Sequence, residues 1–85
     1  MLRLVSLYDR ASKSFGRPFV VTHLAQAVRG LTDEVNNTEQ GSDLSRHPAD
    51  FDLYHVGDFD ESLGTVEAFN APALIVRADT LVKES

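Results

Sequence analysis

This 85-residue chain contains one stretch with the periodicity of an amphipathic helix. Its apolar residues recur at steps of four, three and four: Leu24, Val28, Leu31 and Val35. That spacing places them on one face of a helix of about 13 residues, with Thr22 as its N-cap and Asn36-Asn37 at its end. One apolar helical face cannot form a core by itself, so the rest of the chain must supply the surface on which it packs.

The flanking sequence favours β-strands. Residues 19–21 are expected to be extended or a short edge strand. Three segments have the composition of strands: residues 2–8, 51–56 and 64–69. The last two predict a hairpin, joined by an acidic connection with turn-forming residues at 57–64. We expect Pro72 to end the second strand of this hairpin, and residues 74–76 to form a further short strand.

These elements predict an α+β fold in the order β-α-β-β. A small antiparallel or mixed sheet of three to four strands would carry one amphipathic helix on one face. The chain is expected to be a single domain over residues 1–85, with a flexible polar loop at 36–47 and a helical or frayed tail at 79–85. One sheet face and one edge would stay uncovered, so we also expect a homodimer.

Composition excludes several kinds of chemistry. The chain has no cysteine, which excludes disulfides, zinc–cysteine sites and thiol catalysis. The three histidines are scattered outside any nucleophile–base–acid signature, and no glycine-rich phosphate loop or calcium-loop spacing is present. We therefore expect no enzyme activity, no catalytic residues, no cofactor and no metal. No apolar run approaches the roughly 18–20 residues of a membrane span, so a membrane is not an expected partner.

The net charge of −5 argues against a general nucleic-acid binder, because such proteins are usually basic. The charge is unevenly distributed, however. Residues 1–32 carry five lysines and arginines against one acid, whereas residues 33–85 carry three against twelve acids. This asymmetry predicts one basic and one acidic surface.

A polar, basic loop is expected at residues 9–18. Within residues 10–19, three cations alternate with two phenylalanines and two serines, the pattern in which cations contact phosphates and aromatic rings stack on bases. The candidate nucleic-acid-binding residues in the basic part of the chain are Arg10, Lys13, Phe15, Arg17 and Arg29. The alternative is an ordinary basic loop whose phenylalanines anchor it to the core.

The densest acidic group lies in the predicted hairpin. This group could be a solvated turn, hold a divalent cation, contact another protein or mimic the charge of DNA; its members are Asp50, Asp52, Asp58, Asp60 and Glu61. We take Asp58, Asp60 and Glu61 as candidate protein-contact residues.

Two motifs carry a family resemblance. The first is Phe15-Gly16-Arg17-Pro18-Phe19, and the second is His-Pro-x-Asp-Phe-x-Leu-Tyr followed by Gly-x-Phe-Asp, at residues 47–60. Together with the helix and the Asp33-Glu34-Val35-Asn36-Asn37 segment, the sequence resembles the small non-structural protein of gokushovirus-type microviruses. These are bacteriophages with circular single-stranded DNA genomes, and the resemblance covers residues 3–77.

The resemblance implies a non-enzymatic viral accessory protein. Such a protein would bind single-stranded DNA, or the replication complex that carries it, during genome replication or the switch to single-strand synthesis and packaging. It would act in the host bacterial cytoplasm and would not be a virion component. The alternative is an acidic adaptor that docks on the replication initiator, a host replication protein or the procapsid. The family supplies no catalytic or DNA-contacting residues.

Overall fold

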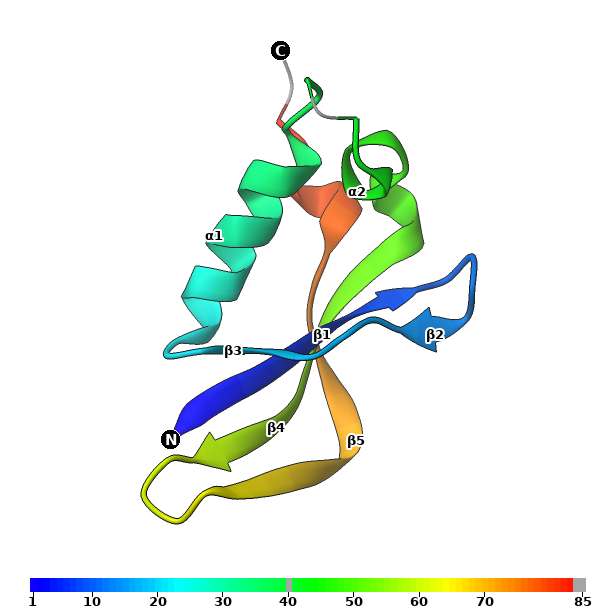
Figure 1. The fold of residues 1–85 in the computed structure, drawn as a ribbon. Helices are drawn as coiled ribbons and strands as arrows, with labels where there is room; N and C mark the ends of the chain where they lie inside the picture. The colour runs from blue at the N-terminus through cyan, green and yellow to red at the C-terminus, as the bar shows by residue number, and fades with distance from the viewer. Residues whose placement is uncertain (40, 84–85) are drawn as a thin grey trace.

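The structure is a computed structural model that describes residues 1–39 and 41–83. Its main element is a β-sheet. Its strands are β1 (Leu2–Asp9), β2 (Ser14–Phe15), β3 (Phe19–Val21), β4 (Phe51–Asp60) and β5 (Thr65–Arg77). They follow the order β2-β1-β4-β5, with β3 also paired to β1, and every pairing is antiparallel. The sheet curls like half of a barrel (Figure 1).

The predicted β-α-β-β sheet of three to four strands is therefore wrong. Three strands precede the helix instead of one, and the sheet has five. The expected loop at 9–18 instead turns back along β1, where the Gly16 N–H donates to the Leu7 carbonyl over 2.8 Å. This return pairs β2 with the end of β1 and β3 with its beginning.

The predicted hairpin also differs from the structure. The first strand continues to Asp60, and the second runs from Thr65 through Pro72 to Arg77, so the separate strand at 74–76 does not exist. Because β5 is an outer strand, the missing N–H of Pro72 leaves no partner unsatisfied. A register shift opposite His55–Gly57 absorbs the extra residues of β5.

Helix α1 (Leu24–Val35) forms where the periodicity predicts it. Its N-cap is His23 instead of Thr22, because the Gln26 side chain accepts hydrogen bonds from the backbone N–H groups of both residues. The helix ends at Asn36, whose side chain also binds the backbone of Leu81. That contact holds a 3-10 turn, Ala78–Leu81, against the end of the helix.

Short helical turns join α1 to β4. Helix α2 (Asp43–Arg46) lies within the segment expected to be a polar loop, and a 3-10 turn (Pro48–Asp50) follows it. Residue 40 of that loop and residues 84–85 of the expected tail lie outside the described residues. Across the part of the chain that is described, no helix is long and apolar enough to cross a membrane.

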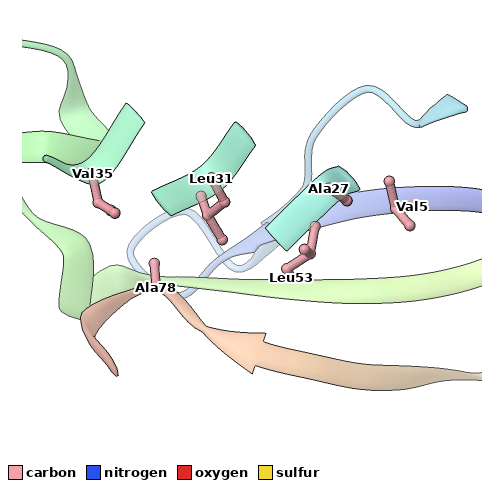
Figure 2. Packing of buried hydrophobic residues seen from close by; sticks show 6 residues of the cluster. All are labelled: Val5, Ala27, Leu31, Val35, Leu53 and Ala78. Atoms are coloured by element: carbon pink, nitrogen blue, oxygen red, sulfur yellow. The ribbon is translucent and has the colours of Figure 1, made fainter. Parts of the chain in front are cut away.

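The core lies between α1 and one face of the sheet. Figure 2 shows its buried residues: Val5, Ala27, Leu31, Val35, Leu53 and Ala78. Val5 and Leu53 on β1 and β4 are fully buried beneath the helix. Since successive strand residues point to opposite faces, the neighbours of these core residues point away from α1.

Candidate nucleic-acid interface

Three aromatic side chains gather on the sheet face that points away from α1. The ring centroids of Tyr8 and Phe15 lie 4.9 Å apart, and that of Tyr54 lies 5.4 Å from Phe15 and 6.3 Å from Tyr8. The rings meet in tilted or edge-on arrangements, which are favourable for aromatic pairs. We call these three residues the aromatic cluster.

Strand pairing brings the cluster together. Tyr8 on β1 lies directly opposite Phe15 on β2, and Tyr54 on β4 is paired with Ser6, two residues before Tyr8. Leu7 and Leu53, which precede the two tyrosines, pack on the helix side of the sheet. The alternation of a strand therefore places both tyrosines on the open face.

The cluster lines a shallow hollow of about 460 Å³, and Pro72 on β5 forms another of its walls. Phe15 is 45% exposed even though it contacts both tyrosines. An open, ring-lined hollow of this kind can accept a flat aromatic group such as a nucleobase.

Two of the predicted cations lie next to the cluster in sequence and are exposed. Lys13 occupies the β1–β2 turn with a φ of 57°, and Arg17 follows β2. Among the described residues, neither side chain takes part in an ion pair. Both are therefore available to a phosphate.

The structure does not bring all five candidates together. Arg29 lies on the exposed side of α1, which Figure 1 shows at the left of the molecule, whereas β2 lies at the right. The basic residues of the first 32 positions thus do not form one surface.

Arg10 has partners within the protein. Its Nε and Nη2 donate to the two carboxylate oxygens of Asp52 over 3.1 and 2.7 Å, and its Nη1 donates to the Ala49 carbonyl over 2.8 Å. The Asp52 side chain is only 8% exposed. This two-point ion pair ties the end of β1 to β4.

Asp58, predicted to contact a protein, faces inward. Its Oδ1 lies 3.2 Å from Arg3 and 2.9 Å from Nε2 of His55. Burial raises the pKa of the Asp58 carboxyl, but hydrogen bonds from His55 and Arg3 outweigh burial and hold the pKa below its ordinary value. The ring of His55 also meets the ring of Phe69 edge-on, with 4.5 Å between the ring centroids.

The other two acidic candidates lie at the β4–β5 turn. Asp60 shapes that turn by accepting hydrogen bonds from the hydroxyl and backbone N–H of Ser62, which lower the pKa of its carboxyl. Glu61 is exposed, 3.9 Å from the N-terminal ammonium of Met1. Within residues 1–39 and 41–83, no group of three or more metal-ligating side chains is close enough to hold a metal ion.

Local composition predicted Phe15, Lys13 and Arg17 of this candidate site, but not Tyr8, Tyr54 and Pro72. The alternation of residues along 2–8 and 51–56 could have predicted that both tyrosines lie on the open face, since each follows a residue of the core face.

Residues 2–81 match a family model described as "Phage ORF5 protein". The chain is also 34% identical over 61 residues to Protein ORF5 of Chlamydia phage 1. The aligned part covers 69% of this chain and 64% of that protein, so the chain spans less than two thirds of the curated relative that it matches. No solved structure matches the chain.

Proposed function

Because the chain belongs to the phage ORF5 protein family, we propose that it is a non-enzymatic accessory protein that binds single-stranded DNA through the aromatic cluster. The family match and the Chlamydia phage relative confirm the resemblance to gokushovirus-type microviruses. We place its action in phage genome replication, or in the switch to single-strand synthesis and packaging. This action would occur in the host bacterial cytoplasm and outside the virion.

The aromatic cluster is the observation that supports this function most directly. Tyr8, Phe15 and Tyr54 present ring surfaces in a hollow that no other described side chain fills. Stacking of one base on an aromatic side chain contributes about 1–3 kcal/mol and does not depend on sequence. A site of this kind suits a protein that binds a genome at many positions.

The exposed cations next to the cluster complete the proposed site. Lys13 and Arg17 flank Phe15 in sequence and would contact the phosphates on either side of a stacked base. Arg10 would not, because its donors already bind Asp52 and Ala49. The acidic β4–β5 turn, at the bottom of Figure 1, lies away from β2 and so leaves the site free of its repulsion.

The same geometry favours single strands over a duplex. In duplex DNA both faces of each base are stacked and its edge is paired, so a base must leave the stack to enter the hollow. An unpaired strand offers its bases without that cost.

Fluorescence anisotropy with a labelled oligothymidine of about 20 nucleotides at low salt tests the proposal. We expect Phe15→Ala and Tyr54→Ala each to weaken binding by about 5- to 100-fold, the equivalent of one lost stacking contact. The double variant Lys13→Ala/Arg17→Ala should weaken DNA binding further at low salt. It should also lower the number of counterions released on binding, measured from the salt dependence, by roughly one to two.

Phe69→Ala is the matched control, because Phe69 is a partly exposed aromatic residue outside the cluster. It should leave affinity unchanged once thermal melting has verified that each variant folds. Absence of binding by the wild-type protein, or full binding by Phe15→Ala and Tyr54→Ala, would contradict the proposed function.

One observation favours the adaptor as a second candidate. At the acidic β4–β5 turn, Leu63 and Val66 are 73% and 57% exposed, and Glu61 lies between Asp60 and these apolar residues. Mixed apolar and acidic surfaces of this kind suit contact with another protein, such as the replication initiator, a host replication protein or the procapsid. A folded protein that does not bind oligothymidine would favour this second candidate.

A further inference from the structure

Gly30, in the middle of α1, has no explanation within the monomer. A glycine weakens a helix relative to alanine, yet the backbone of Gly30 does not adopt a positive φ. A Cβ built at this position would meet no atom within 4 Å. Neither backbone conformation nor internal packing therefore requires glycine here, whereas close approach of another molecule would.

An apolar hollow lies beside Gly30. It has a volume of about 210 Å³, and its floor and walls come from β1, β3, β4 and α1, including Leu7, Phe19 and Leu31. Phe19 remains 43% exposed at its border. Because Leu7 and Leu53 point into this hollow while Tyr8 and Tyr54 line the other one, the two hollows lie on opposite faces of the sheet.

The charges on the exposed side of α1 are arranged by sign. Arg29 precedes Gly30 and Asp33 follows it, whereas Glu34 is half-buried and lines the hollow. In the described part of the chain, none of these three side chains forms an ion pair. A helix with its positive charge on one side of a glycine and its negative charges on the other complements an antiparallel copy of itself.

We propose that a second copy of this chain covers the hollow, with the two α1 helices crossing antiparallel at Gly30. A two-fold axis at this point places Arg29 of each copy about 3 Å along the helix axis from Asp33 of the other, because antiparallel helices reverse their charge order. The same axis brings the two apolar hollows together, so that each exposed Phe19 is covered. A two-fold interface requires a self-complementary surface, and this one satisfies that requirement in shape and charge.

The sequence suggested a dimer that covers one sheet face and one edge, but the helix face is a better dimer surface. Strand β5 forms that edge, but Pro72 and a register shift interrupt it, and both features discourage pairing with another strand. The proposed interface also leaves the aromatic cluster open, so it does not depend on DNA binding.

Sedimentation equilibrium with light scattering tests the dimer. We expect twice the chain mass of 9.4 kDa for the wild-type protein, and the monomer mass for Gly30→Leu, whose side chain would occupy the crossing point. Gly30→Leu should still unfold in a cooperative thermal transition, because nothing inside the protein obstructs its side chain. Thr65→Leu is the matched control, because Thr65 is exposed at the start of β5, outside both α1 and the hollow; this variant should remain dimeric.

A charge exchange tests the orientation of the helices. Arg29→Asp places like charges opposite one another and should weaken the dimer at least about tenfold. The double variant Arg29→Asp/Asp33→Arg exchanges the two charges within each chain and should restore the dimer. A wild-type protein that stays monomeric at the highest soluble concentration would overturn the proposal, as would a dimer that Gly30→Leu leaves intact. Failure of the double variant to restore the dimer would overturn the antiparallel crossing.

Discussion

Arg10 lies in the most basic part of the chain, yet all three nitrogens of its guanidinium group have partners within the protein. Lys13, three positions later, is exposed at a turn and has no ion-pair partner among the described residues. Composition cannot separate two such cations, because the partner of Arg10 is Asp52, 42 positions away in sequence. Tyr8 and Tyr54 were not predicted for the same reason, because they contact Phe15 only through strand pairing.

The Arg10–Asp52 pair gives a prediction for stability. Arg10→Ala leaves the carboxylate of Asp52 nearly buried and without its cation. This should lower the free energy of unfolding by about 1–3 kcal/mol. The value is below the cost of breaking a fully buried pair because Arg10 is partly exposed. Lys13→Ala should change it by less than about 0.5 kcal/mol. Urea denaturation measures both values. Equal stability of Arg10→Ala and the wild type would show that the pair does not stabilise the fold.

At the level of elements, the sequence predicts what is local. Strand β1 and helix α1 form close to where pattern and capping residues place them. Strands β2 and β3 were not predicted as a return along β1, because their few residues carry no periodicity and gain their partners from β1 alone. Pro72 was misinterpreted for a similar reason, since whether a proline ends a strand depends on whether the strand is an outer one.

Gly57 shows how closely β4 and β5 approach. A Cβ on Gly57 would lie 2.6 Å from the carbonyl oxygen of Glu67, a backbone atom that cannot move without shifting the strand. We expect Gly57→Ala to lower the free energy of unfolding by about 1–3 kcal/mol. Gly16→Ala is the control, because its Cβ would make only an ordinary contact at 3.6 Å. Urea denaturation curves that coincide for the two variants would contradict this account of the β4–β5 pairing.

The whole molecule has two sheet faces with different properties. One carries α1, the core and the apolar hollow beside Gly30, and the other carries the aromatic cluster. The net charge of −5 is a sum over the whole chain and does not describe either face, because Lys13 and Arg17 lie beside the aromatic cluster whereas Asp60 and Glu61 lie at the β4–β5 turn. Separation of the faces allows one surface to bind DNA while the other joins two copies.

This separation predicts that the advantage in DNA affinity of the dimeric wild type over a monomeric variant increases with DNA length. An oligothymidine of about 8 nucleotides fits one site, so the wild type and the monomeric Gly30→Leu variant should bind it with equal affinity per chain. An oligothymidine of about 40 nucleotides can reach both sites of a dimer, and the second contact then forms at high effective concentration. The wild type should therefore bind the long strand at least about tenfold more tightly than Gly30→Leu does. Anisotropy titrations with the two lengths measure the ratio, with Thr65→Leu as the dimeric control. A ratio that stays the same at both lengths would mean that the two DNA sites of a dimer do not act together on one strand.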